Sequence, residues 1–248
     1  MAKQKSIVTL EGTLGTINFY TRKGKPVARR AGGGFTSKAV KTSPTMVRVR
    51  ENSSEFGLVS KAKKTVRLGL HAFLKDYTDV NLHSRMMQLF QTIKALDPVS
   101  ERGQRRFEHG LGTEAGKHLF LNFAFTTTKA SAVLPGIGVF NPSSSSYAIS
   151  NLAASKLVLP KGATGMQLCL GILAPSFADD TFSFHSSPIV TLDPTSSNST
   201  ISLTPTSLPS GDGLRIAVLQ VRYYQTVNGV SVLLHELDAQ ALEIVGVY

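Results

Sequence analysis

The hydrophobic periodicity of the chain changes near residue 117, and this change constrains the fold more than any other feature. Before it, the longest apolar patterns repeat every three or four residues, which predicts helices. From residue 118 onward, apolar residues alternate or form short runs bounded by Pro, Ser and Gly, which predicts strands. Helices followed by many short strands are typical of an α+β protein. We therefore expect a boundary in the segment HGLGTEAGKH, between residues 117 and 118.

The charge of the chain changes at the same place. Residues 1–117 contain 22 Lys and Arg against 9 Asp and Glu, a net charge of +13. Residues 118–248 contain 5 against 7, a net charge of −2. We expect three parts: a β arm with a Gly-rich joint (1–42), a basic helical hairpin (43–117) and an antiparallel β-sandwich (118–248).

The first part is predicted to be a small β-meander over residues 6–31. Its strands are SIVTLEG, TINFYTR and KPVARR, with Lys23-Gly24 as a turn. The Gly-rich segment AGGGF then forms a flexible joint. A sheet this short is not stable in isolation, so it must pack on another part of the chain or on a neighbouring subunit.

Two helices are predicted for the second part. The first starts at Ser43, a capping residue, and Pro44, which suits the first helical position, and it runs to about Tyr77. The second ends at Asp97-Pro98. Their expected core residues are Phe56, Val59, Val66, Leu70 and Phe73 on the first helix and Leu82, Met86, Leu89, Phe90, Ile93 and Leu96 on the second. An antiparallel hairpin follows from the short connection DYTDVN.

Short strands are predicted throughout the third part. The runs are HLFLNFAFT, SKLVLP, GMQLCLGILA, TFSFHS, STISLT, LRIAVLQVRYYQ, VSVLLHEL and ALEIVGVY. Between two of them, Asn228-Gly229 supplies the two residues that a tight hairpin turn needs. Seven or eight such strands indicate an antiparallel sandwich.

No catalytic or metal-binding pattern stands out. The segment GLGTEAGKH fails the phosphate-loop pattern twice, with Leu111 and His118 where Gly and Ser or Thr are required. The six histidines form no metal-ligand spacing. Asp179-Asp180 suits a turn, and Cys169 suits a buried, inert thiol. We expect no enzyme activity, no cofactor, no metal and no small-molecule substrate.

Targeting signals are also lacking. The first residues contain no apolar signal-peptide core, and no apolar run is long enough to span a membrane. We expect a cytoplasmic protein, or one released as part of a particle.

The basic residues allow one functional hypothesis, nucleic-acid binding. Lys63, Lys64, Arg67 and His71 share one broad face of the first helix. Phosphate backbones are bound by cationic surfaces of this kind. The candidate residues are Lys61, Lys63, Lys64, Arg67, Arg102, Arg105 and Arg106.

The preferred hypothesis is self-assembly, because the arm has no core of its own to pack on. The arm would add to a sheet of a neighbouring copy. Arg48, Arg50, Glu51 and Glu55 carry matched charges about one helical turn apart, which suits a protein contact better than a phosphate contact. The basic helices would meet acidic segments such as ADD or HELDAQALE on the next copy. The candidate residues are Ile7, Leu10, Phe19, Tyr20, Arg48, Arg50, Glu51 and Glu55. A head-to-tail contact of this type gives a ring, tube, filament or capsid-like particle.

Three segments carry a family resemblance: KQKSIVTLEGTLGTINFY, VRVRENSSEFGLVSKAKKTVR and SERGQRRFEHG. They resemble an uncharacterised protein family common in Bacteroidota. Its arm has Gly-x-x-Gly-x-x-x-Phe-Tyr, here Gly12, Gly15, Phe19 and Tyr20. Its helix has Arg-x-Arg-Glu-Asn-x-x-Glu-Phe-Gly, here Arg48, Arg50, Glu51, Asn52, Glu55, Phe56 and Gly57. The closing YYQTVNGVSVLL is similar to the family's last hairpin. The resemblance implies no enzyme activity and leaves both hypotheses open.

Overall fold

The fold is α+β, as the sequence predicts, and every strand pairing among the described residues is antiparallel. It was obtained as a computed structural model of the whole chain. The structure describes residues 2–4, 8–31, 36–210 and 213–248. The chain divides into two compact units, residues 1–53 and 54–248, and each is described by itself.

The first unit holds a four-stranded sheet in the order β1-β4-β3-β2. Its elements are β1 (Ala2–Lys3), β2 (Gly12–Leu14), β3 (Ile17–Arg22), β4 (Lys25–Arg30), α1 (Ser37–Thr42) and the 3₁₀ turn η1 (Pro44–Met46). The expected turn is confirmed, because Lys23 and Gly24 have positive φ values of 50° and 73°. Two expectations lie outside the described residues: Ile7 and the glycines of the joint, 32–34.

The predicted first strand, SIVTLEG, is wrong for the residues that the structure describes. Val8 to Glu11 are not in a strand, and only Gly12 belongs to β2. Instead, the Gln4 side chain forms hydrogen bonds with both backbone groups of Leu10. It donates to the Leu10 carbonyl at 3.2 Å and accepts from the Leu10 N–H at 3.0 Å. A side chain that binds both backbone groups replaces the ladder that a strand would form.

The helices are α2 (Val47–Gly69), α3 (His71–Leu74), α4 (Leu82–Lys94), α5 (Phe107–Leu111), α6 (Glu114–Leu121) and α7 (Ala130–Val133). The first predicted helix is shorter than expected, since α2 ends at Gly69 and a separate turn, α3, follows. Ser43 makes no side-chain capping bond, whereas Thr36 caps α1 by accepting from the Ala39 N–H at 3.1 Å. The predicted second helix is confirmed as α4, with Leu82, Met86, Phe90 and Ile93 buried.

The predicted strand HLFLNFAFT is wrong, because its first four residues continue α6 and the rest forms only an isolated bridge at Ala124. The Thr113 hydroxyl accepts a hydrogen bond from the Gly116 N–H at 3.0 Å and so caps this helix. Gly116 lies against α5: a Cβ added there would be 2.0 Å from the Gly110 carbonyl oxygen. Close packing of two short helices therefore determines this segment, which the alternation of apolar residues does not indicate.

The strands of the second unit form two sheets. They are β5 (Ile137–Asn141), β6 (Ser146–Ser150), β7 (Gly165–Ser176), β8 (Thr181–Ser186), β9 (Val190–Leu192), β10 (Ile201–Leu203), β11 (Ile216–Val227), β12 (Val230–Leu233) and β13 (Gln240–Val247), with 3₁₀ turns η2 (Ala154–Lys156) and η3 (Leu237–Ala239). The Asn228-Gly229 hairpin is confirmed, with φ values of 51° and 79°. No strand forms over SKLVLP, which begins in η2.

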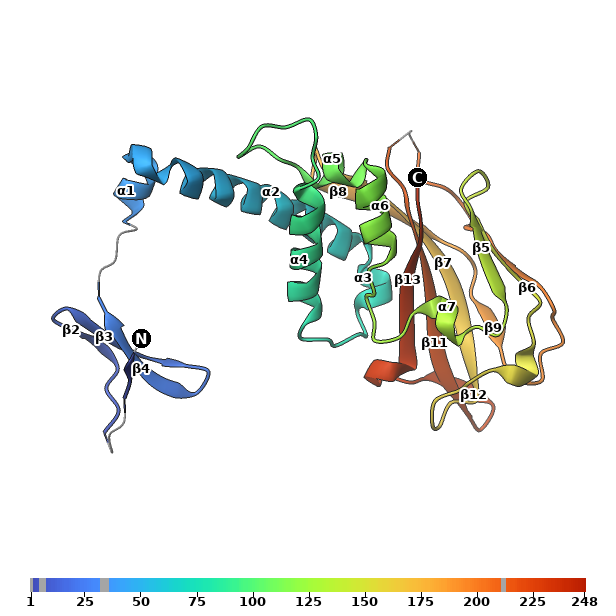
Figure 1. Cartoon of the computed structure of the whole chain (residues 1–248). Helices are drawn as coiled ribbons and strands as arrows, with labels where there is room; N and C mark the ends of the chain where they lie inside the picture. The colour runs from blue at the N-terminus through green and yellow to red at the C-terminus, as the bar shows by residue number, and fades with distance from the viewer. Residues whose placement is uncertain (1, 5–7, 32–35, 211–212) are drawn as a thin grey trace. The chain divides into compact units, whose positions relative to one another are not determined.

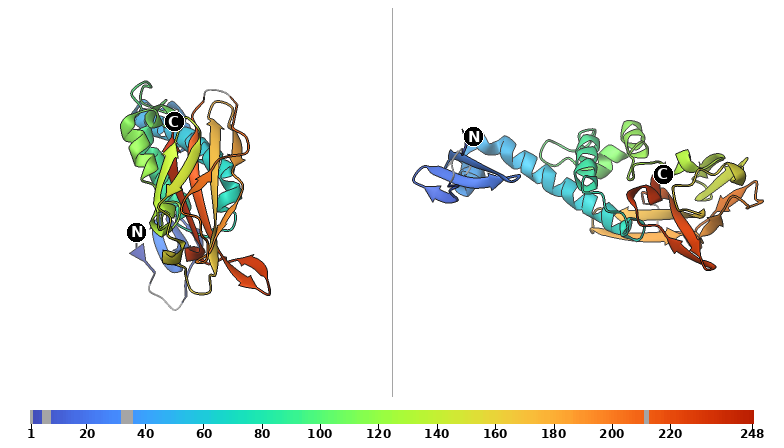
Figure 2. Two further views of the ribbon diagram at one scale, coloured as in Figure 1. Left: turned by 90° about the vertical axis from the view of Figure 1, so that its right-hand side faces the viewer. Right: turned by 90° about the horizontal axis from the view of Figure 1, so that it is seen from below.

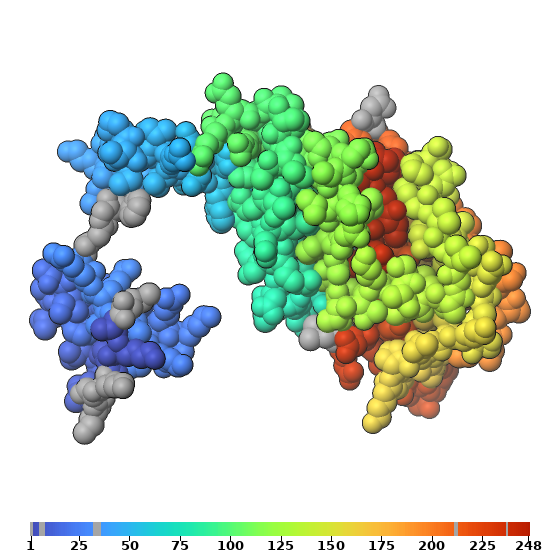
Figure 3. Space-filling view, viewed as in Figure 1, coloured from blue at the N-terminus to red at the C-terminus, as the bar shows by residue number. Residues whose placement is uncertain are grey.

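The two 12-residue strands β7 and β11 pair along most of their length and form the centre of this unit. Helices α2 to α6 cover one face of their sheet, and the small β10-β6-β5 sheet together with α7 covers the other (Figure 1 and Figure 2). In Figure 3 the helical residues form a continuous layer beside β13. The helical hairpin and the sandwich thus share one core, and the expected boundary at residues 117–118 does not separate compact units.

Buried polar groups fix the helical layer to the sheet. The side-chain amides of Gln220 on β11 and Gln240 on β13 both donate to the Phe73 carbonyl, at 3.1 and 2.6 Å. Arg222 donates to the Asp76 carboxylate at 2.8 Å just beyond α3. These bonds satisfy a carbonyl at the end of α3 and determine where the helix ends lie on the strands.

The contact between α5 and α6 gives a stability prediction. Gly116→Ala is expected to lower the free energy of unfolding by about 2–3 kcal/mol, because its Cβ would overlap a backbone oxygen that cannot move freely. Gly112→Ala is the matched control, because its Cβ would lie 3.4 Å from the nearest atom. Urea unfolding of both variants measures the difference. Equal midpoints for the two variants would contradict the packing described here.

Candidate functional site

The sheet of the first unit has no buried residue. Every described residue from 2 to 53 is exposed or half-buried, although four strands are present. A folded sheet normally buries one face against another layer. This unit therefore presents surfaces that are available for binding.

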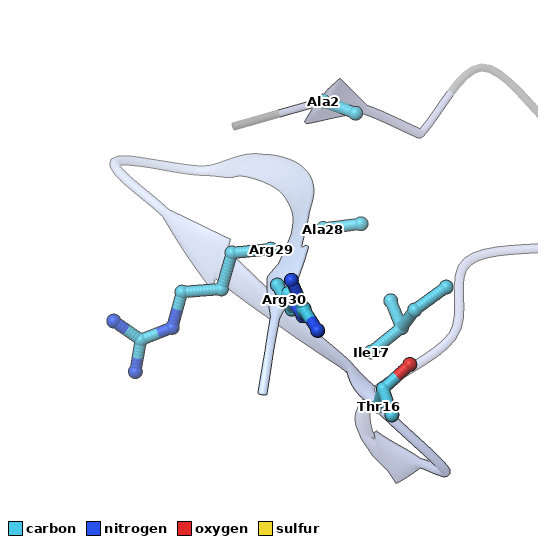
Figure 4. Close-up of a pocket in the computed structure, with 6 residues that line it drawn as sticks. All are labelled: Ala2, Thr16, Ile17, Ala28, Arg29 and Arg30. Carbon is cyan, nitrogen blue, oxygen red and sulfur yellow. The ribbon is translucent and has the colours of Figure 1, made fainter. Parts of the chain in front are cut away.

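One face of this sheet is apolar. The strand register places Phe19 opposite both Ala28 and Gly12, and Ile17 opposite Leu14. The face consists of Ala2, Gly12, Leu14, Ile17, Phe19, Pro26 and Ala28, with Thr21 and Arg30 at its ends. Leu14 is 73% exposed. The face includes a cavity of about 450 Å³, where Figure 4 shows Ala2, Ile17 and Ala28 on the same side of the sheet, whereas Arg29 points away.

The opposite face is cationic. It carries Tyr20 and Val27 together with Lys3, Arg22, Lys25 and Arg29. The Arg29 guanidinium carbon lies 5.3 Å from the centre of the Tyr20 ring, a cation–π contact. Residues 1–53 contain 11 Lys and Arg but 2 Asp and Glu, so this unit has a net charge of +9. Phe19 and Tyr20, which the sequence analysis grouped together, thus belong to faces of different chemistry.

The predicted assembly residues on α2 lie in different environments. Arg48 is exposed. Arg50 is used within its own unit, since it donates to the carbonyls of Val40 and Ser43 at 2.8 and 3.0 Å. Glu51 is half-buried. The expected pairing of Arg50 with an acidic side chain of this helix is therefore not what the described part of the structure contains. The partners of Arg50 are backbone oxygens at the end of α1.

Glu55 is a correction to the predicted assembly set. It is buried and pairs with the Lys94 ammonium of α4, and it accepts from the Gly103 N–H at 2.8 Å. Arg105 lies 4.0 Å away. Burial alone raises the pKa of this carboxyl, but the Lys94 and Gly103 hydrogen bonds outweigh burial and hold the pKa below its ordinary value. Glu55 thus connects helices within the chain and presents no charge at the surface.

Asp97 organises the loop between α4 and α5 in a similar way. Its buried carboxylate accepts from the N–H groups of Val99 and Arg106 at 2.8 Å and of Ser100 at 3.1 Å, and His109 lies 3.3 Å away. Burial acts to raise the pKa of Asp97, but these bonds outweigh it and hold the pKa far below its ordinary value. The arginine-rich loop is therefore held in shape by a buried anion.

Four of the predicted nucleic-acid residues lie near acidic groups or on this loop. Lys61 lies 3.8 Å from Asp180, so this lysine contacts the ADD segment of its own chain. Arg106 lies 3.4 Å from Glu108, and Arg105 lies near Glu55. Arg102 is exposed on the same loop. Lys61 and Arg106 line one pocket together with Glu108 and Asp180, so acidic groups lie among these cations.

The other three predicted nucleic-acid residues come together in a groove. Lys63, Lys64 and Arg67 of α2 line a cavity of about 470 Å³. The remaining lining residues are Ser60, Leu68, His71 and His83. We name this cavity the cationic groove. The sequence placed His71 on the correct face but missed His83, although an antiparallel hairpin brings the start of the second helix beside the end of the first.

The outer face of the β10-β6-β5 sheet is a second uncovered surface. Its residues are Ile137, Val139, Asn141, Ser146, Ala148, Ser150 and Ser202, none of them charged. Ile137 and Val139 are each 59% exposed. Strand β5 pairs only with β6 in the described part of the chain, so its other edge is open. This charge-free face, on which Ile137 and Val139 are exposed, differs from the charged surface that most proteins present to water.

Other candidate sites carry no chemistry that the structure supports. Cys169 is buried in β7, and burial raises the pKa of its thiol, as expected for an unreactive cysteine. Asp179-Asp180 forms the turn between β7 and β8, as predicted. Within the described residues, no group of His, Cys, Asp and Glu is arranged to hold a metal ion. None of the described helices is long and apolar enough to cross a membrane.

Comparisons of this chain with protein-family models, with curated proteins and with solved structures find no match.

The Asp97 site gives a pH-dependent prediction. Because the folded-state pKa of Asp97 is lowered, its contribution to stability is complete above the unfolded-state pKa of about 4 and disappears as the pH falls through the lower folded-state value. Asp97→Asn is therefore expected to lower the free energy of unfolding by about 2 kcal/mol at pH 7, because the N–H donors lose the anion that they bind. The difference from the unmodified protein is expected to become progressively smaller below about pH 4. Chemical unfolding from pH 7 to pH 3 measures this difference. A deficit that stays constant over this range would contradict the ionised state assigned to Asp97.

Proposed function

We propose that this protein is a non-enzymatic structural subunit that assembles head to tail with copies of itself. In this proposal, the apolar face of the N-terminal sheet of one copy packs on the outer face of the β10-β6-β5 sheet of the next. The observation that carries the proposal is the absence of any buried residue among those described from 2 to 53.

The first argument is energetic. Leu14 and Ile17 are largely exposed, and Phe19 is half-buried, on one face of an ordered sheet. Burying side chains of this size is worth about 1.5–3 kcal/mol each. Isolated small sheets are marginal in water, so a docked layer would stabilise both the sheet and the contact. A second copy supplies such a layer without requiring another protein.

The second argument concerns the receiving surface. The outer face of the small sheet is uncharged and includes Ile137 and Val139. The first unit, with a net charge of +9 over residues 1–53, meets no cation there, whereas docking two such units on each other would bring two such charges together. Sheets pack face to face about 10 Å apart, which places the cationic face of the arm away from the contact.

The third argument concerns symmetry. The donor face and the receiving face are different surfaces of the same chain. A contact between unlike surfaces is heterologous, and it closes into a ring or continues as a filament or tube. The same contact builds a capsid-like particle where copies meet in more than one direction.

Nucleic-acid binding is the second candidate function. The observation that favours it is the net charge of +9 in residues 1–53, where Lys3, Arg22, Lys25 and Arg29 share a sheet face with Tyr20. Such binding would weaken steeply as the salt concentration rises, because counterions are released on binding. Assembly through apolar faces would persist at moderate salt.

A charge placed on the apolar face of the arm tests the assembly. Ile17→Asp is expected to weaken association at least tenfold, since it removes an apolar contact and buries a charge. Asn18→Asp is the matched control: it is the neighbouring residue on the same strand, it points to the opposite face, and it introduces the same charge. Analytical ultracentrifugation of nuclease-treated protein measures both. Equal effects of the two variants would contradict docking by the apolar face.

The receiving face is tested separately. Val139→Asp is expected to weaken association as strongly as Ile17→Asp, and mixing the two variants is expected to give complexes no longer than two chains, because only one of the two contacts remains intact. If Val139→Asp assembles normally while Ile17→Asp does not, the arm docks elsewhere, on another arm or on its own chain, and the head-to-tail proposal fails.

Removal of residues 1–31 gives a complementary prediction. The truncated chain is expected to remain folded, with an unfolding free energy within about 0.5 kcal/mol of the full chain, because the second unit has its own core. It is expected to be monomeric at every concentration. Negative-stain electron microscopy and sedimentation measure this, and rings or filaments of the truncated chain would contradict a role for the arm.

A further inference from the structure

We propose that the cationic groove binds a phosphate group. The groove lies wholly within the second unit, between α2 and α4, and the proposal is independent of how copies assemble. It is lined by three basic side chains and two histidines, and by no carboxylate.

Lys63 is the central residue of this site. Its side chain is buried, at 6% exposure, and its ammonium contacts the His83 ring nitrogens at 3.0 and 3.1 Å. Among the described residues, no carboxylate pairs with it. Burial lowers the pKa of Lys63, and the charge of Arg67 lowers it further. A buried ammonium whose contact is an imidazole lacks the counter-charge that such groups require.

The surrounding residues complete an oxyanion site. Lys64, Arg67 and His71 are exposed along the groove, and they form no ion pair within the described part of the chain. Arg67 presents a planar fork of N–H donors, and Lys63 presents up to three donors. The Ser60 hydroxyl adds a neutral donor at the edge. A tetrahedral dianion would satisfy the buried ammonium and neutralise the nearby cations at once.

Three other cations of the helical layer have a carboxylate partner, which Lys63 lacks among the described residues. Lys94 is paired with Glu55, Arg85 with Asp79 and Arg106 with Glu108. A solvated basic face would carry exposed cations alone, without a buried one at its centre. The volume of about 470 Å³ lies in the range of small-molecule sites, so a phosphorylated metabolite fits as well as one phosphate of a polymer.

Thermal unfolding of the full chain tests the site, with inorganic phosphate, pyrophosphate, a mononucleotide and a single-stranded oligonucleotide as probes. A ligand that binds the folded state raises the unfolding temperature, and the increase grows with the logarithm of the ligand concentration divided by Kd, so phosphate probes are expected to stabilise the protein more than sodium chloride of equal ionic strength. If no phosphate probe exceeds sodium chloride, the proposal is wrong.

Substitutions identify the groove as the site. Lys63→Met is expected to keep or raise the unfolding temperature without ligand, because it removes an uncompensated buried charge, and to reduce phosphate affinity at least tenfold. Arg67→Gln, at an exposed position, is expected to reduce affinity without affecting folding. Lys61→Gln is the matched control, because Lys61 lies on the same helix outside the groove. If all three variants retain the affinity of the unmodified protein, the groove is not the site.

The probes also distinguish the source of the phosphate. Tight binding of the mononucleotide or pyrophosphate, with a shallow salt dependence, supports a small phosphorylated ligand. Binding of the oligonucleotide alone, with a steep salt dependence that Lys63→Met reduces, supports a polymer backbone. A loss of oligonucleotide binding with Arg29→Gln but not with Lys63→Met would assign nucleic acid to the arm and contradict the groove.

Discussion

The second unit depends on the burial of both faces of the β7–β11 pair. Along β7, Leu168, Leu170 and Ile172 face the small sheet, whereas Cys169 and Leu173 face the helices. Strands covered on both sides need apolar residues at almost every position, which is why these two read as continuous apolar runs. Close approach is also required, and glycine provides it: a Cβ at Gly69 would lie 2.3 Å from the Leu173 side chain. The helical hairpin is therefore one layer of this core and cannot be a separate domain, whatever the change in periodicity along the chain indicates.

In the N-terminal sheet, by contrast, the described residues of neither face are buried. It has the alternation of a half-buried sheet, with an apolar and a cationic face, but no described residue of its own unit covers the apolar face. The apolar face is identified from the strand register as well as from exposure, because the register places Leu14, Ile17 and Phe19 on one side of the sheet. A chain that builds a complete two-sided core in one unit and leaves a one-sided sheet in the other is suited to complete that sheet by association.

Sequence patterns predicted correctly those elements whose conformation depends on residues close together in the chain. The β11–β12 turn follows from Asn228-Gly229, since both residues adopt positive φ, and α4 follows from its apolar stripe. Predictions failed where a helix cap or the packing between helices decides. Residues 118–121 alternate like a strand, yet the cap at Thr113 and the Gly110–Gly116 contact make them helical. Phe56 fits the apolar stripe of α2 but is 54% exposed. Of the candidate sites, the basic helical face was predictable. His83 and the burial of Lys63 were not, because both depend on how α2 and α4 pack.

The distribution of counter-charges separates the functional hypotheses more clearly than the number of cations does. The helical segment reads as strongly basic, but Glu55, Asp79 and Glu108 each pair with a basic side chain within the chain. A paired cation has already recovered the electrostatic energy that a ligand would otherwise supply, so it contributes little to further binding. Two regions concentrate basic side chains: the cationic face of the arm and the groove around Lys63. The first is an exposed surface whose attraction for anions salt weakens. The second contains the buried Lys63 beside exposed cations, which is the basis of the proposed phosphate site. The two regions therefore differ in kind, and the proposed assembly through the arm is compatible with the proposed phosphate binding in the groove.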